Sequence, residues 1–259
     1  MNKTELLMLL DKIAPLDLSE EWDNSGIQID LGKQEINKVL IALETDRDVV
    51  KTARESEADM IITHHPLFFP KGAVDHLISS DVNQKNIIEL IQSGIEVVSL
   101  HTCYDAAPGC MNDCLCDLLG IKKPKTFAGN IPRIGRLAEP VTLSEYEKTV
   151  FERLGRPSGV LVGGAPEKLI RTVAVCSGAG GEFWKDALNE GADLFISGEI
   201  KHHEMDLIRQ TNMAFIAAGH AGSEWIFVPA LASQIRRMCL EPPQIIEYNN
   251  KQIPFDRVL

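Results

Sequence analysis

Two adjacent histidines, His64 and His65, end a run of β-branched apolar residues in the stretch IITHHPLFF. Imidazole is a common metal ligand and a general acid or base near neutral pH. Six of the seven histidines lie just past a short apolar run, and only His76 does not. In open α/β sheets, ligands bind beyond the carboxyl ends of the strands. If the runs are neighbouring parallel strands, their ends converge, and one site could collect these side chains.

The adjacency of the two histidines indicates a pair of metal ions rather than a single one. Successive side chains on an extended backbone point in opposite directions, and Pro66 favours an extended conformation for His65. Diverging imidazoles chelate one ion poorly, but each could bind a different ion of a pair about 3.5–4 Å apart. Such a pair needs a bridging group, and Glu224 in the stretch GHAGSEW offers a carboxylate.

Further metal-binding side chains follow other predicted strands. His220 precedes Glu224 by four residues, and Asp105 follows His101 by four residues in HTCYD. We expect Asp105 to be a second carboxylate ligand, and His101 to be a ligand or the hydrogen-bond partner of one. A mixed set of imidazoles and carboxylates suits Zn, Fe, Mn, Co or Ni and does not choose between them.

The elements that position these residues alternate between strands and helices. Continuous apolar runs predict parallel strands buried on both faces, separated by helix-period segments such as residues 83–93 and 182–190. The predicted strands are residues 38–43, 59–63, 95–100, 172–176, 193–197 and 214–218. This alternation predicts an α/β fold class with mostly parallel sheets flanked by helices.

The chain is expected to form two lobes. A Lys-, Pro- and Gly-rich segment places a boundary near Thr126. Residues 1–125 with 220–259 would form the metal-binding α/β lobe, and residues 126–219 a second α/β lobe. The apolar stripe at the N-terminus predicts an amphipathic helix that Thr4 could cap, rather than a signal peptide.

Composition narrows the class of protein. The chain has 259 residues and a formal net charge of -11, and this acidic balance repels phosphate backbones and disfavours nucleic acid as a partner. No run reaches the ~18–20 apolar residues of a membrane span. The cysteine cluster at Cys103, Cys110, Cys114 and Cys116 contains no CxxC pair, so we expect reduced thiols in a cytoplasmic protein.

Five motifs, taken together, resemble the NIF-three-like dinuclear-metal family, whose members are often labelled GTP cyclohydrolase I type 2 homologues. The motifs occur in the family order between residues 22 and 224, and they are WDNSG, THHP, HTCYDAAPGCMND, SGEIKHHE and AGHAGSE. The chain departs from the usual family residues at Cys103-Tyr104 and at Ala221. Neither departure falls on an expected ligand, so they bear on the substrate pocket.

The resemblance implies a NIF-three-like fold, a dinuclear metal site between the lobes and a homohexameric ring. Two divalent metal ions per chain would be the cofactor. The implied metal ligands are His64, His65, Asp105, His220 and Glu224. In that family pattern His64 and His220 favour one ion, His65 and Asp105 favour the other, and Glu224 bridges them.

Two functions follow as hypotheses. The first is a metal-dependent hydrolase, GTP cyclohydrolase-like by resemblance, acting on a nucleotide or pterin-type small molecule. Its catalytic residue would be His101, and its substrate-binding residues Lys201, His202 and His203, although KHHE also fits a solvated helix start. The alternative is a non-catalytic, metal-binding or metal-handling oligomer. Five protein ligands for two ions leave open coordination positions, which favours the hydrolase.

Overall fold

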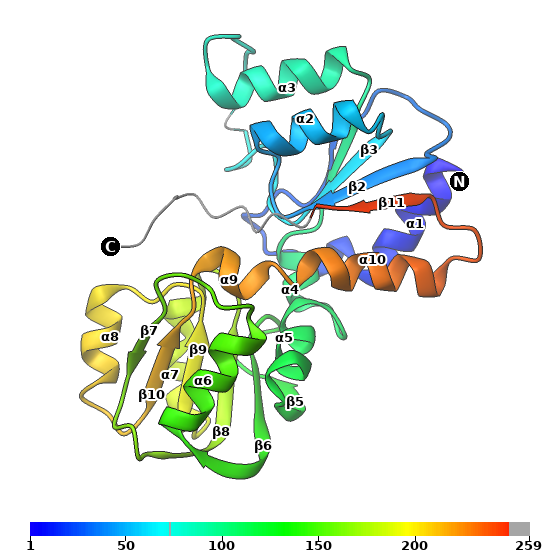
Figure 1. Cartoon of the computed structure of the whole chain (residues 1–259). Helices are drawn as coiled ribbons and strands as arrows, with labels where there is room; N and C mark the ends of the chain where they lie inside the picture. The colour runs from blue at the N-terminus through cyan, green and yellow to red at the C-terminus, as the bar shows by residue number, and fades with distance from the viewer. Residues whose placement is uncertain (73, 249–259) are drawn as a thin grey trace. The chain divides into compact units, whose positions relative to one another are not determined.

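The computed structural model describes residues 1–72 and 74–248, which form two compact units (Figure 1). The first unit comprises residues 1–107 and 227–248, and the second comprises residues 108–226. Each unit has its own sheet with helices against it, so the predicted α/β class is confirmed. The prediction of mostly parallel sheets is correct for the first sheet and wrong for the second, in which three of the five strand pairs are antiparallel. No helix among the described residues is long and apolar enough to cross a bilayer.

The first unit is built on a five-stranded sheet with strand order β1-β4-β3-β2-β11. Strands β4, β3, β2 and β11 run parallel, and β1 pairs antiparallel with β4 at the edge. Its elements are α1 (Lys3–Ile13), the 3-10 helix η1 (Leu16–Leu18), β1 (Gly26–Ile29), β2 (Lys38–Ala42), α2 (Arg47–Glu55), β3 (Met60–Thr63), α3 (Val82–Gln92), β4 (Glu96–Ser99), α4 (Thr102–Ala106), α10 (Phe227–Met238) and β11 (Gln244–Glu247).

The second unit has a six-stranded sheet with strand order β5-β6-β8-β9-β10-β7. Only its centre is parallel, because β5, β6 and β7 pair antiparallel while β8, β9 and β10 run together. Its elements are α5 (Met111–Leu119), β5 (Lys122–Thr126), β6 (Arg133–Thr142), α6 (Leu143–Arg153), β7 (Leu161–Gly163), β8 (Leu169–Cys176), η2 (Gly180–Phe183), α7 (Trp184–Asn189), β9 (Leu194–Ser197), α8 (His202–Ile208), β10 (Ala214–Ala217) and α9 (His220–Glu224).

The six predicted strands all exist, because their runs are buried on both faces. All four residues of β3, β4, β9 and β10 are buried. In the first unit, α2 and α3 cover one face of the sheet through a buried cluster, and α10 packs on β2 at the other face (Figure 1). In the second unit, α5 and α6 cover one face, while α7 and α8 cover the other.

The units divide at different residues from the predicted lobes. The predicted boundary near Thr126 assigned α5 and β5 to the first lobe, but the structure includes both in the second unit. The reason is packing: Leu115 and Leu119 of α5 share a buried cluster with α6, and β5 pairs with β6. Helix α9 also belongs to the second unit. Residues 249–259 of the predicted first lobe lie outside the described residues.

Local capping chemistry sets where the helices begin. Asp46 caps α2 by accepting hydrogen bonds from the backbone of Asp48 and Val49. The first helix begins two residues earlier than expected, because Asn2 rather than Thr4 is its cap: the Asn2 side chain accepts from the Thr4 N–H at 2.9 Å. The prediction of a Thr4 cap was therefore wrong, and Thr4 lies inside the helix.

Three of the four clustered cysteines are small buried side chains. Cys103, Cys110 and Cys116 are buried, and all six cysteines are free thiols. Burial raises the pKa of Cys103 to about 11 and that of Cys116 to about 12. Both thiols therefore stay protonated at neutral pH and are poor metal ligands or nucleophiles.

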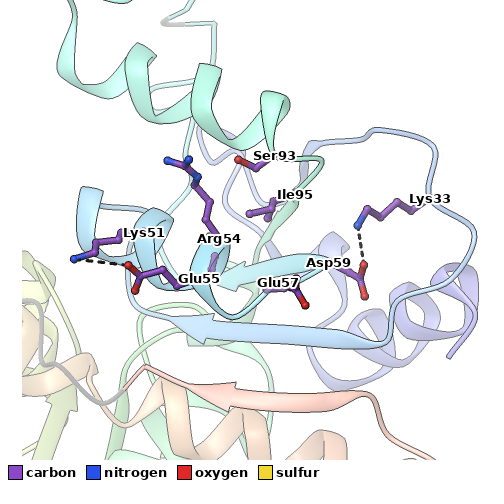
Figure 2. A pocket seen from close by; sticks show the side chains of 10 residues that line it. Lys33, Lys51, Arg54, Glu55, Glu57, Asp59, Ser93 and Ile95 are labelled. Atoms are coloured by element: carbon purple, nitrogen blue, oxygen red, sulfur yellow. Dashed lines mark hydrogen bonds and ion pairs between the residues drawn. The ribbon is translucent and has the colours of Figure 1, made fainter.

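A partly buried carboxylate ties the starts of two strands together in each sheet. Asp59, which precedes β3, accepts hydrogen bonds from the N–H groups of Asn37 and Lys38 at 2.8 and 3.1 Å and from Lys33 Nζ at 2.7 Å (Figure 2). Asp193, which precedes β9, accepts from the N–H groups of Arg171 and Thr172. Burial alone would raise the pKa of Asp59, but the bonds from Lys33 and the backbone hold it below its ordinary value of 3.8.

Replacing this carboxylate should cost stability only where the carboxylate is ionised. We expect Asp59→Asn to lower the free energy of unfolding by about 1–3 kcal/mol at pH 7, because an amide accepts fewer of the three donors. Since the folded pKa is depressed, the contribution persists above pH 3.8 and is lost as pH falls through the folded value. Urea denaturation at pH 7 and at pH 3 checks this, because the difference between Asp59→Asn and the wild type should be smaller at pH 3; exposed Asp75→Asn is the control. Equal stability of Asp59→Asn and the wild type at pH 7 would contradict it.

Candidate metal centre

The adjacent histidines lie immediately after β3. The strand ends at Thr63, and the chain bends at His64 and His65. The two imidazole rings therefore lie side by side, with centroids 5.0 Å apart and planes inclined by 47°. The prediction that the rings diverge was wrong, because it applied strand alternation to residues beyond the strand. Thr63 supports the bend by donating its hydroxyl to the His65 carbonyl at 2.8 Å.

The buried imidazole of His64 is fixed in one tautomer. Its Nδ1 lies 2.9 Å from the carbonyl oxygen of Leu100. A carbonyl only accepts hydrogen bonds, so Nδ1 carries the proton and Nε2 presents a lone pair. That Nε2 lies 3.8 Å from Oδ1 of Asp105, which is also buried. A lone pair and a carboxylate facing each other at this distance suit a cation that both can bind.

His101 is held by a carboxylate that sequence reasoning missed. Its Nδ1 lies 2.7 Å from Oδ1 of Asp23, whose other oxygen accepts from the hydroxyls of Ser25 and Thr102, each at 2.6 Å. Burial alone would raise the pKa of Asp23, but the hydrogen bonds from His101, Ser25 and Thr102 hold it well below its usual range. Asp23 is therefore ionised at neutral pH and keeps the proton of His101 on Nδ1.

One ring nitrogen each from His64, His65 and His101 lies within 4.8 Å of the others, close enough to share a metal ion. The third histidine, His65, has its Nδ1 3.4 Å from Oε1 of Glu44, a half-exposed residue after β2. The structure thus brings together the residues that the sequence placed after β3 and β4, and it adds His101 to the group that could hold a metal.

The second unit carries a matching pair on α9. His220 Nδ1 lies 2.9 Å from Oε1 of Glu199, which follows β9, and His220 Nε2 lies 3.1 Å from Oε2 of buried Glu224. The sequence analysis did not assign Glu199 to the site. Its position holds the Nδ1 side of His220, so the Nε2 side faces Glu224.

Glycine makes room for the Glu224 carboxylate. Gly178 follows β8 with a φ of +60°, and a Cβ added there would stand 2.1 Å from Oε1 of Glu224 and 3.4 Å from Nε2 of His220. Its N–H donates to the hydroxyl of Ser223 at 2.9 Å. The backbone after β8 therefore packs directly against α9, and any side chain at this position would displace the carboxylate.

The predicted substrate-binding residues Lys201, His202 and His203 are exposed at the start of α8. The Lys201 N–H donates to the buried Glu204 carboxylate at 2.8 Å, which is ordinary helix capping. Their substrate role stays a prediction.

A cavity in the first unit lies elsewhere. It has a volume of about 600 Å³ and borders the amino ends of β3 and β4, next to Asp59 and Ile95 (Figure 2). The histidines follow the carboxyl ends of the same strands. Two ion pairs lie within its lining, Lys33 with Asp59 and Lys51 with Glu55, and Arg54 of the lining pairs with Glu89. This cavity is therefore not the histidine site.

The donor set fits a divalent transition metal. The first unit offers three imidazole nitrogens and the Asp105 carboxylate, and the second offers His220 and Glu224. In each of the four histidines Nδ1 faces an oxygen, as it does in histidines that bind metal through Nε2. The histidine and carboxylate groups could therefore hold metal.

The chain matches known proteins over almost its whole length. The sequence model described as Duf34/NIF3 (NGG1p interacting factor 3) covers residues 1–252. A protein of Clostridium perfringens named GTP cyclohydrolase 1 type 2 homolog is 28% identical over 99% of both chains. A protein of the same name from Clostridium acetobutylicum is 30% identical over 95% of both chains.

Solved structures share the fold. A hypothetical protein of Staphylococcus aureus superposes with a TM-score of 0.90 at 22% identity, covering 100% of this chain and 99% of its own. Reduced HcgD from Methanocaldococcus jannaschii superposes with a TM-score of 0.78 at 25% identity, covering 96% of this chain and 98% of its own. These two solved structures thus have the same fold as this chain.

The close approach of Gly178 to Glu224 gives a direct test of the second unit's metal-binding pair. We expect Gly178→Ala to lower zinc affinity at least tenfold, because the methyl group displaces the Glu224 carboxylate. The control is Gly191→Ala: that glycine also has a positive φ, +80°, but a Cβ there would meet nothing within 4 Å. Both variants carry the same kind of backbone strain. A difference in their zinc affinities, measured by competition with a chelating dye, therefore reports the contact between residue 178 and Glu224. Equal zinc affinity in the two variants would contradict the assignment.

Proposed function

The chain belongs to the Duf34/NIF3 family, and on that premise we propose that it is a dinuclear-metal-dependent hydrolase acting on a nucleotide or pterin-type substrate. The relatives named GTP cyclohydrolase 1 type 2 homolog support this substrate class. The observation that carries the proposal is the orientation of the histidines: Nδ1 of His64, His65, His101 and His220 faces an oxygen in each case.

The proposed metal ligands are the set that the family resemblance implies: His64, His65, Asp105, His220 and Glu224. Glu224 would bind both ions, since one carboxylate can give an oxygen to each. Five protein ligands leave positions for water and substrate at two ions, which is the mark of a catalytic rather than a purely structural site.

Bound divalent ions would supply Lewis acidity and a water whose pKa falls to about 7. The protein residues would handle the proton and the substrate. His101 would accept a proton at Nε2 as the general base, because ionised Asp23 holds the other ring proton on Nδ1 and stabilises the imidazolium that forms. Lys201, His202 and His203 would bind the polar groups of the substrate.

We further propose that the protein acts as a homohexamer, as the family resemblance implies. Light scattering coupled to gel filtration should give six times the 28.6 kDa chain mass. Removing metal with a chelator should leave that mass unchanged if the ions serve catalysis. Loss of the oligomer on chelation, with no turnover by any metal form, would instead favour the metal-binding scaffold.

The bridging assignment predicts unequal effects of two carboxylate substitutions. Glu224→Ala should lose both ions, because each ion loses a ligand, whereas Asp105→Ala should mainly empty one site. Elemental analysis of protein purified without chelator measures the metal-to-chain ratio. Glu190→Ala, which removes an exposed carboxylate paired with Lys125, is the control and should retain both ions. Two ions bound at full occupancy in Glu224→Ala would show that Glu224 is not the bridge.

The hydrolase assignment itself is tested by turnover. Protein loaded separately with Zn, Fe, Mn, Co or Ni would be incubated with GTP, cyclic nucleotides and simple phosphoesters, and the products separated by chromatography. We expect hydrolysis of a nucleotide that Asp105→Ala abolishes and Glu190→Ala preserves. The absence of turnover with every metal would refute the enzyme assignment.

A further inference from the structure

Two large aromatic side chains stand exposed beside His101. Trp22 is 55% exposed and Phe69 is 50% exposed. Their ring centroids lie 6.0 Å apart with the planes at 77°. Each centroid also lies 5.9 Å from that of the His101 ring, at 78° and 79°. Leaving this much aromatic surface in water is unfavourable, so the arrangement calls for an explanation.

The exposure does not come from a loose segment, because residues next to both rings are held in place. Asp23, next to Trp22, donates its N–H to the Glu20 carbonyl at 3.0 Å and buries its carboxylate under His101. On the other side, the Asn24 side-chain amide donates to the carbonyl of Phe68 at 2.8 Å.

A second bond holds the same loop. The Phe68 N–H donates to Oε1 of Gln28 in β1 at 3.2 Å, so the loop that carries Phe69 is joined both to Asn24, two residues after Trp22, and to β1. The two aromatic rings are thus positioned before any ligand arrives, which reduces the entropy lost on binding.

The mutual geometry suits a flat ligand. Two rings inclined by nearly a right angle form a corner, in which a third ring can stack on one face and meet the other ring edge to face. Stacking on Trp or Phe accepts any planar heteroaromatic ring and requires no specific hydrogen bond. The corner adjoins His101, which the proposed function makes the general base.

We propose that Trp22 and Phe69 form an aromatic platform that binds the planar heteroaromatic ring of the substrate, a purine or a pterin, beside His101. The inference rests on the proposed function for the identity of the substrate, but the platform itself rests on the positions of the two rings. The aromatic residues select the ring and the metal-binding residues act on it, so binding and turnover can be tested separately.

The test is ring-dependent binding without turnover. Calorimetric titrations would compare guanosine 5′-monophosphate, neopterin and ribose 5-phosphate, the last of which lacks the aromatic ring, on metal-loaded and on chelator-treated protein. We expect the two ring compounds to bind and ribose 5-phosphate to bind much more weakly. The tighter of the two ring compounds identifies whether the platform prefers the purine or the pterin.

Four variants assign the binding to the platform. Trp22→Ala and Phe69→Ala should each weaken binding of the tighter ring compound by about 5- to 150-fold, the effect of one lost stacking contact. Trp22→Phe keeps an aromatic face and should restore most of the affinity. Phe151→Ala removes an exposed phenylalanine of the second unit and should change nothing. Because both platform residues are exposed, melting temperatures close to that of the wild type should accompany these changes.

The outcomes separate this inference from the proposed function. Ring-dependent binding that Trp22→Ala weakens, in a protein with no turnover, supports the platform while the hydrolase assignment fails. Unchanged affinity for the ring compounds in Trp22→Ala and Phe69→Ala overturns the platform, even if the protein hydrolyses a phosphoester. Equal binding of ribose 5-phosphate and the ring compounds to the wild type, or no binding of either ring compound, also overturns it.

Discussion

The oxygen that faces Nδ1 of each imidazole, hydrogen-bonded to His64, His101 and His220 and 3.4 Å away in His65, is the contact on which the rest of the site depends. Neutral imidazole has one donor and one acceptor nitrogen. An acceptor oxygen facing Nδ1 keeps the proton on Nδ1 and leaves the lone pair on Nε2. The carbonyl of Leu100 and the carboxylates of Glu44, Asp23 and Glu199 take this role for His64, His65, His101 and His220 respectively. Each ring then presents Nε2 on the side away from that oxygen.

The same construction occurs in both units. In each, a β-α-β-α-β segment is followed by a short helix after its third strand. A histidine stands at the start of that helix, and a buried carboxylate follows four residues later. These pairs are His101 with Asp105 after β4, and His220 with Glu224 after β10. In each, an aspartate before the middle strand ties two strand starts together. Because the strands are parallel and flush in register, their ends deliver these side chains to one edge of each sheet.

The sequence predicted the elements well and the polar partners poorly, for a physical reason. Buried parallel strands are continuous apolar runs, so β2, β3, β4, β8, β9 and β10 could be recognised, and the histidines after them were located with them. The partners of those histidines could not be found in this way. Asp23 meets His101 across 78 residues, and Glu199 meets His220 across 21. No local periodicity encodes such a pairing.

The errors have equally local causes. The rings of His64 and His65 were expected to diverge, but a bend after Thr63 ends the alternation of the strand. The cap of α1 was assigned to Thr4 because hydroxyl and amide side chains both cap helices, and Asn2 precedes it. The observed boundary between the units differs from the predicted one near Thr126, because α5 packs with α6 rather than with the first sheet. In each case a contact decided between options that the sequence left open.

The central claim is that the histidines bind two metal ions through Nε2 because Nδ1 is already engaged. A crystal structure of the zinc-loaded protein, with anomalous diffraction measured at the zinc edge, tests it most directly. The account predicts two anomalous peaks per chain, about 3.5–4 Å apart, with His64, His65 and His220 coordinating through Nε2. A single peak, or coordination through Nδ1 with the bonds to Leu100, Glu44 and Glu199 broken, would contradict it.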